Sequence, residues 1–296
     1  MQEEIRVVQR HPWFRLLRPT QWSKNTVVLA ALVFGQVWEE PFNILRAVVA
    51  MIAFCLISSA GYILNDWVDI ESDRHHPIKR RRPLASGAIS VPHAAGLGAV
   101  LLIVSLSISF AVSPWLMLVI AAYGALMTCY SLWLKHVVII DVFVISIGFL
   151  LRAFAGGVAV GVRISPWLML CTVLLALFLG FCKRRNEIMT LERNATLHRR
   201  SLSGYSSQIL DIFIPLAASS TLLAYSVYSF TAESVPRNGA MMITIPLVGF
   251  AIFRYLYLVY GRALGGAPEV LLFRDRPLLA SIVLWGLAVA GVFWLG

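Results

Sequence analysis

Residues 43–64 read NILRAVVAMIAFCLISSAGYIL, and residues 65–74 continue as NDWVDIESDR. The first stretch holds a single charged residue, Arg46, in 22 positions. About 20 apolar residues are enough for a helix to cross the hydrocarbon core of a bilayer. Backbone groups find no water in lipid, so a continuous apolar run of this length has to be helical there. The stretch predicts a transmembrane helix that ends at a cluster of acidic residues.

Eight further apolar segments occur in the chain, at 25–39, 89–112, 115–134, 138–161, 166–182, 208–231, 240–260 and 278–296. The composition agrees, with 59% apolar and 14% charged residues and a mean hydropathy of +0.78. Soluble domains carry about 25% charged residues, so a soluble enzyme is excluded. The apolar runs do not alternate at period two, which argues against a β-barrel. We expect an all-α membrane protein, with nine transmembrane helices in a single polytopic membrane domain over residues 1–296.

Basic residues are distributed asymmetrically about these segments. Twenty of the 25 Lys and Arg residues fall in residues 1–24, 65–88, 135–136, 183–207 and 261–277, on one predicted side, and the other side receives Arg46, Arg163 and Arg237. Positive loops face the cytoplasm. We therefore expect a multi-pass protein of the inner (plasma) membrane with a cytoplasmic N-terminus and an outer C-terminus. The net charge of +10 then reflects topology and contact with the lipid bilayer, and no nucleic-acid partner is expected.

The acidic stretch after residue 64 has the spacing of a metal site. Asp66, Asp69 and Asp73 are three and four residues apart, so on a helix their carboxylates share one face. Oxygen ligands without His or Cys suit Mg²⁺, which is commonly shared between carboxylates and substrate phosphates. The basic run that follows, residues 79–82, could hold further phosphate charge. The alternative is a solvated acidic turn balanced by basic topology residues.

This pattern resembles a known family. Asn65-Asp66-x-x-Asp69-x-x-x-Asp73, followed by the sequence RPLASG at 82–87, resembles the first Asp-rich motif of the UbiA-type intramembrane prenyltransferase superfamily. The resemblance implies a UbiA-like bundle of nine helices with a cytoplasm-facing cavity. It also implies that Asn65 and the three aspartates hold Mg²⁺ on the diphosphate of a donor.

The second Asp-rich motif of that superfamily is replaced here. Residues 183–192 read KRRNEIMTLE, in which Glu187 and Glu192 are the only acids. A second carboxylate clamp is therefore not expected. A site with fewer anions and more cations suits additional phosphate groups.

This departure is similar to the decaprenyl-phosphate phosphoribosyltransferase branch of the superfamily. Further matching stretches are RPTQWSKN at 18–25, YSLWLKH at 130–136 continuing to Asp141, GF at 148–149 with Arg152, CKRRNE at 182–187, and HRR at 198–200 through Tyr205. The resemblance implies transfer of phosphoribose from phosphoribosyl pyrophosphate to a polyprenyl phosphate, with Mg²⁺ as cofactor and release of pyrophosphate. Its usual association is with cell-wall biosynthesis, as a source of arabinan precursors. Homo-oligomer formation is left open.

The expected site divides into two sets. The catalytic set is Asp66, Asp69 and Asp73. The substrate-binding set is Lys24, Asn65, Arg74, Lys79, Arg82, Tyr130, Lys135, Asp141, Arg152, Lys183, Arg184, Glu187, Arg200 and Tyr205.

Some of these residues have a second interpretation. Asp141 and Arg152 are eleven residues apart, so they share a helix face. Arg152 either lies under the donor's ribose or a phosphate, or forms an interhelical ion pair with Asp141 or another buried acid. Lys24 and Lys135 either bind phosphate or only anchor helix ends.

Two other functions are alternatives for the whole chain. One is a UbiA-like prenyltransferase that uses prenyl diphosphate and an aromatic or lipid acceptor, against which the missing second Asp cluster argues. The other is a transporter, whose charges would lie near the midplane of the membrane. A degenerate scaffolding homologue is disfavoured because the acidic motif is complete.

Overall fold

The computed structural model describes residues 11–76, 79–192, 204–262, 264–266 and 268–295. These residues are almost entirely helical and include no β-strand. Eight helices are long and apolar enough to cross a membrane, so the chain is a multi-pass membrane protein. They are α3 (Pro41–Val68), α5 (Val91–Val112), α6 (Pro114–Leu132), α7 (Ile140–Val160), α8 (Pro166–Glu192), α9 (Ser207–Thr231), α10 (Ile245–Arg262) with the preceding 3₁₀ turn η5 (Ala240–Thr244), and α12 (Arg276–Leu295).

Shorter helical elements connect or precede these spans. They are α1 (Pro12–Leu17), η1 (Pro19–Leu29), α2 (Ala30–Phe34), α4 (Ile70–Arg74), η2 (Lys79–Arg81), η3 (Leu134–His136) and α11 (Pro268–Arg274). The expected ends of most spans agree with the structure to within a few residues. The end of the sixth does not, because α8 continues to Glu192 and carries the KRRNE sequence on its last turns rather than on a loop.

The first expected span, residues 25–39, differs from the prediction. Here the eleven residues of η1 form a 3₁₀-helix that runs directly into the five residues of α2. Polar side chains lie within η1, and Asn25 is buried against the bundle. Among the residues that the structure describes there are eight long apolar helices, so the expected count of nine is not confirmed.

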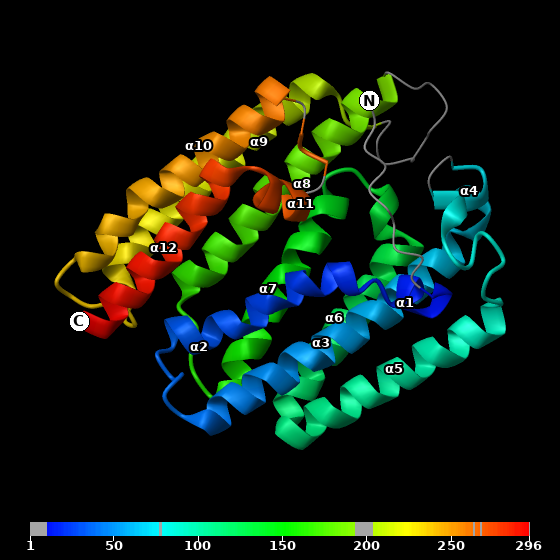
Figure 1. The fold of residues 1–296 in the computed structure, drawn as a ribbon, viewed down its shortest axis with the longest axis horizontal. Helices are drawn as coiled ribbons and strands as arrows, with labels where there is room; N and C mark the ends of the chain where they lie inside the picture. The colour runs from blue at the N-terminus through cyan, green and yellow to red at the C-terminus, as the bar shows by residue number, and fades with distance from the viewer. Residues whose placement is uncertain (1–10, 77–78, 193–203, 263, 267, 296) are drawn as a thin grey trace.

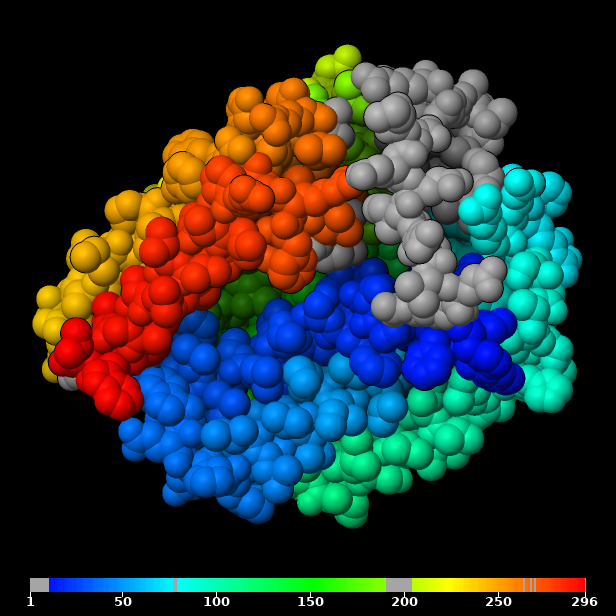
Figure 2. Space-filling view, viewed as in Figure 1, coloured from blue at the N-terminus to red at the C-terminus, as the bar shows by residue number. Residues whose placement is uncertain are grey.

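The helices form two groups around a central helix (Figure 1). In one group α3 packs against α5 and α6, with Phe54, Ile120 and Tyr123 in its core. In the other, α8 packs against α9, and α10 packs against α9 and α12, with Phe178 and Tyr255 in the core. Helix α7 contacts both groups through α6 and α8, and η1 lies across α3 and α7. Figure 2 shows a hollow between α12 and the η1–α2 segment, floored by the middle of the chain.

Successive crossings place every second connection at the same end of the bundle. The end of α3, helix α4, η3 and the end of α8 therefore lie at one end, which we call the motif face (Figure 1). The turns before α6 and before α8 lie at the other end, the far face. The aromatic rings of Phe34 and Trp38 pack against those of Trp285 and Phe293 on α12, which joins the end of α2 to α12.

Candidate active site

Asp66 and Asp73 lie together at the motif face, held by arginines. Asp66 is on the last turns of α3 and Asp73 is on α4, and each is only 2% exposed. Arg82 donates from one nitrogen to both, at 3.0 Å from Asp66 Oδ1 and 2.5 Å from Asp73 Oδ2. Arg18 also donates to Asp66 Oδ1. Buried charges need such partners, so two carboxylates and two guanidinium groups form one compact cluster.

Asp69 belongs to the same motif but has different partners. It caps the end of α3, where the chain turns into α4, and its side chain is 25% exposed. Lys135 Nζ, from η3, lies 2.6 Å from Asp69 Oδ1, and Asn65 Nδ2 donates to Asp69 Oδ2 at 3.1 Å. The lysine side chain is 3% exposed. An ammonium group from the middle of the chain is thereby fixed at the acidic motif.

The acidic motif offers carboxylate and amide oxygens, which is the donor chemistry that Mg²⁺ prefers. The described residues contain no ready-made group of three His, Cys, Asp or Glu side chains arranged around one point. The carboxylates instead contact Arg18, Arg82 and Lys135. Burial lowers the pKa of Arg18, and the neighbouring Asp66 carboxylate opposes that shift. The donor set fits a divalent cation, provided that these basic side chains move from the carboxylates to a bound anion.

A second buried cluster lies where α7 begins. Asp141 is fully buried, and Arg184 Nε of α8 lies 2.8 Å from its Oδ2. This contact is an ion pair without hydrogen-bond alignment, because neither atom has a hydrogen-bond partner. Arg184 also pairs with Glu187 one turn later, and Tyr130 lies close enough to interact with it electrostatically. The α8 motif therefore joins α7 through a buried charge pair.

Tyr205 connects this cluster to the turn before α7. Its hydroxyl donates to Asp141 Oδ1 at 2.8 Å and accepts the Ile139 N–H at 2.7 Å. Ile139 has φ of +70°, a conformation that costs a β-branched residue energy. A Cβ at Gly204 would lie 2.3 Å from Val138 Cγ2, so glycine permits this close approach. The turn it fixes begins four residues after Lys135, and burial raises the pKa of Tyr205.

Arg152 lies deep in the bundle and has no acidic partner among the described residues. Its Nε donates to Asn25 Oδ1 at 2.7 Å, and one terminal nitrogen donates to the Tyr123 hydroxyl oxygen at 2.6 Å. Its guanidinium lies 4.7 Å from the ring centre of Tyr123 and 5.1 Å from that of Phe149. The suggested ion pair with Asp141 is not formed, because eleven residues correspond to about 16 Å along a helix.

The remaining predicted residues divide by location. Arg74 is exposed and bonds to Glu71, away from the buried carboxylates. Lys24 bonds to Gln21, Lys79 lies on η2 near the motif, and Lys183 is half-buried on α8. Arg200 lies outside the described residues.

Arg18 belongs to this site but is not among the site residues predicted from the sequence. It adopts a left-handed conformation with φ of 51° between α1 and η1, and its guanidinium lies over the Tyr62 ring at 5.0 Å. The signal was present, because Arg18 opens the RPTQWSKN stretch that carried the family resemblance.

Known proteins are similar to this chain in sequence or in fold. A model of the UbiA prenyltransferase family matches residues 26–274. The decaprenyl-phosphate phosphoribosyltransferase of Corynebacterium glutamicum is 36% identical over 279 residues, which cover 92% of this chain and 83% of that protein. The enzyme of the same name from Mycobacterium tuberculosis is 36% identical over 284 residues, 93% of each chain.

Among solved structures, a UbiA homologue from Archaeoglobus fulgidus bound to DMAPP and Mg²⁺ superposes with a TM-score of 0.73. It is 18% identical, and the match covers 96% of this chain and 100% of that one, which establishes a common fold. The family match over most of the length agrees with the acidic motif at the end of α3. The chain belongs to the UbiA prenyltransferase family.

Proposed function

We propose that this protein transfers phosphoribose from phosphoribosyl pyrophosphate to a decaprenyl-type polyprenyl phosphate and releases pyrophosphate. The observation that carries the proposal is one buried acidic cluster surrounded by basic side chains, with no second acidic motif on α8. Donor and acceptor together bring a pyrophosphate, a 5-phosphate and an acceptor phosphate to one site. The names of the relatives from C. glutamicum and M. tuberculosis support the same reaction.

Asp66, Asp69, Asp73 and Asn65 would hold Mg²⁺ at the donor's pyrophosphate. The ion, when bound, acts as a Lewis acid that stabilises the charge on the leaving group. Arg82 and Arg18 each reach Asp66, so their guanidinium groups are placed to contact phosphate oxygens beside the acidic motif. The other substrate contacts come from the substrate-binding set: Lys24, Arg74, Lys79, Tyr130, Lys135, Asp141, Arg152, Lys183, Arg184, Glu187, Arg200 and Tyr205.

The reaction needs no enzyme nucleophile. An oxygen of the acceptor phosphate, already an anion near neutral pH, attacks C1 of the ribose as the bond from C1 to pyrophosphate breaks. Positioning and electrostatic stabilisation then supply most of the rate enhancement. We expect inversion at C1, and trapping of a phosphoribosyl-enzyme adduct without acceptor would contradict this route.

We also propose nine membrane spans in the inner (plasma) membrane, with the motif face and N-terminus in the cytoplasm. Ideal rises of ~2.0 and ~1.5 Å per residue give roughly 30 Å for the combined η1–α2 helix. That length matches the hydrocarbon core, although η1 and α2 together have fewer residues than an ordinary span. The hollow between α12 and the η1–α2 segment supports the proposed cavity, which would open at the motif face.

The test is a transfer assay with purified protein in detergent. Labelled phosphoribosyl pyrophosphate, decaprenyl phosphate and Mg²⁺ should give a lipid-extractable product, and EDTA should abolish it. Asp66→Asn should lose turnover, whereas Glu71→Gln, the same charge change at an exposed position of the same stretch, should retain it. Consumption of geranylgeranyl diphosphate instead of the phosphoribosyl donor would support the prenyltransferase alternative.

A further inference from the structure

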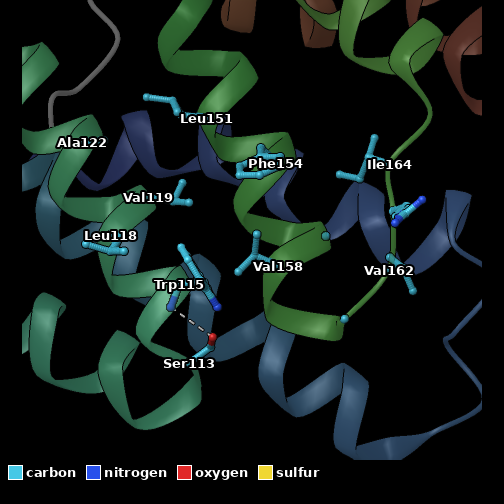
Figure 3. A pocket seen from close by; sticks show the side chains of 13 residues that line it. Ser113, Trp115, Leu118, Val119, Ala122, Leu151, Phe154, Val158, Val162 and Ile164 are labelled. Atoms are coloured by element: carbon cyan, nitrogen blue, oxygen red, sulfur yellow. Dashed lines mark hydrogen bonds between the residues drawn. The ribbon is translucent and has the colours of Figure 1, made fainter.

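A groove lies between α6 and α7 at the far face, away from the acidic motif (Figure 3). Its volume is about 570 Å³, within the ~300–1,000 Å³ typical of small-molecule sites. Its walls are apolar, formed by Leu118, Val119 and Ala122 of α6 and by Leu151, Phe154 and Val158 of α7. From Trp115 to Ala122 the groove follows α6 for about 10 Å, toward the middle of the bilayer.

Two glycines, Gly157 of α7 and Gly161 directly after it, shape the far-face end of this groove. Gly161 ends α7 with φ of +73°, which lets the chain reverse, and the Val162 N–H donates to the Gly157 carbonyl at 3.0 Å. A Cβ at Gly157 would lie 2.8 Å from both the Val162 carbonyl oxygen and Ile164 Cγ1. Larger side chains would displace the turn. The two glycines therefore place Arg163 at the mouth of the groove.

Arg163 is a cation without a counter-ion in this part of the chain. It is exposed and makes no ion pair or hydrogen bond with another described residue. The other polar groups at the mouth are the hydroxyl of Ser113 and the indole of Trp115, and the Ser113 hydroxyl accepts the backbone N–H of Trp115 at 3.2 Å. The apolar groove thus ends at a single positive charge without a described counter-ion, at the far-face end of α7.

We propose that this groove binds an anionic phospholipid of the far leaflet. One acyl chain would lie between α6 and α7, and the lipid phosphate would contact Arg163. The guanidinium group recognises phosphate by charge-assisted hydrogen bonds. A zwitterionic lipid brings its own positive group to the same place, so net negative charge is favoured. The site is separate from the proposed catalytic site and does not depend on the proposed function.

Lipid retention measured by native mass spectrometry tests the proposal. The full-length protein is exchanged into micelles that contain equal amounts of phosphatidylglycerol and phosphatidylcholine, and retained lipids are counted. The wild type should prefer phosphatidylglycerol. Arg163→Gln should lower that preference about fivefold, which corresponds to the ~1 kcal/mol of one arginine near an anionic headgroup. Leu118→Trp, which fills the groove, should lower retention of both lipids.

Arg237→Gln is the matched control, because Arg237 is also an exposed arginine of the far face and does not line the groove. This variant should keep the wild-type preference. An equal loss in Arg163→Gln and Arg237→Gln would show general surface attraction and overturn the proposal. Lipid retention that is unchanged in both Arg163→Gln and Leu118→Trp would also overturn the proposal. If no lipid is retained and Trp115→Cys forms a cross-link between two copies of the protein, the groove is a protein interface and the proposal is wrong.

Discussion

Removing one oxygen from Tyr205 should destabilise the protein by about 3 kcal/mol. In Tyr205→Phe the hydroxyl can no longer donate to Asp141 or accept the Ile139 N–H. A hydrogen bond to a charged group contributes ~1.5–3 kcal/mol, and a buried donor left without an acceptor costs ~1–3 kcal/mol. The two effects overlap because both act on the same turn, so we expect a value near the lower end of their sum.

Thermal and denaturant unfolding in detergent, followed by circular dichroism, would measure this difference. Burial raises the pKa of Tyr205, so the folded state keeps the phenolic proton after the unfolded state has lost it. The stabilisation is therefore complete below pH ~10 and is lost as pH rises above that value, by at most ~1.4 kcal/mol per unit. The other tyrosines are shared by both proteins, so the difference between wild type and Tyr205→Phe should narrow from pH 9 to pH 11.

Tyr257→Phe serves as the control, because Tyr257 is 52% exposed and its hydroxyl makes no hydrogen bond with another described residue. It should change the free energy of unfolding by less than ~0.5 kcal/mol. A Tyr205→Phe protein as stable as Tyr257→Phe would refute the idea that Tyr205 holds the segment before α9 against Asp141 and the turn before α7.

Three further predictions concern other charged contacts. Lys135→Met removes the ammonium group that lies 2.6 Å from Asp69, so kcat/KM for the donor should fall about 10- to 150-fold, which corresponds to the ~1.5–3 kcal/mol of one charge-assisted hydrogen bond. Initial rates measured beside those of Lys135→Arg check this prediction. Equal rates in Lys135→Met and the wild type would contradict it. Arg82→Gln removes a cation that competes for two buried carboxylates, so Mn²⁺ alone should bind more tightly by electron paramagnetic resonance, and weaker binding would count against the metal assignment. Hydrogen bonds from Arg254 lower the pKa of Asp275, so the Asp275 carboxylate stabilises the fold above pH ~4 and this stabilisation is lost in acid. The difference in Tm between the wild type and Asp275→Asn should therefore shrink from pH 6 to pH 3. A difference that stays constant would exclude this role.

Local spacing accounts for what the sequence could predict of the site. Asp66 and Asp73 are only seven residues apart, and the structure brings both to one arginine, although Asp69 caps the end of α3 and the three aspartates do not share one continuous helix. Arg82 follows Asp73 by nine residues in a short connection, so its place beside the motif could be anticipated. The apolar runs likewise fixed the long helices, because lipid leaves the backbone no other partner.

Contacts between distant segments could not be predicted in the same way. Arg18 and Asp66 are separated by 48 residues, and Lys135 and Asp69 by 66. Such pairs depend on how helices pack, about which helical periodicity gives no information. Asp141 and Arg152 illustrate this. Their spacing predicts that they share a face of one helix, but it does not predict which residues of the other helices lie nearest to each of them.

Hydropathy also could not predict that η1 is a 3₁₀-helix. A Cβ at Gly156 of α7 would lie 2.0 Å from the Val28 carbonyl oxygen, so the backbone of η1 packs directly on that glycine. Asn25, in the same segment, bonds to Arg152. Close backbone packing and an internal polar contact shape this segment, and neither is visible in the average polarity of its residues.

The proposed reaction requires that the acidic cluster at the end of α3 holds a divalent cation on the donor's pyrophosphate. A cryo-EM map of the protein with phosphoribosyl pyrophosphate and Mg²⁺ would show whether it does. We predict density for a cation between the carboxylates of Asp66 and Asp73 and the pyrophosphate, with Arg82 turned toward phosphate oxygens. Pyrophosphate bound away from these aspartates, or bound beside them with no cation, would contradict the claim.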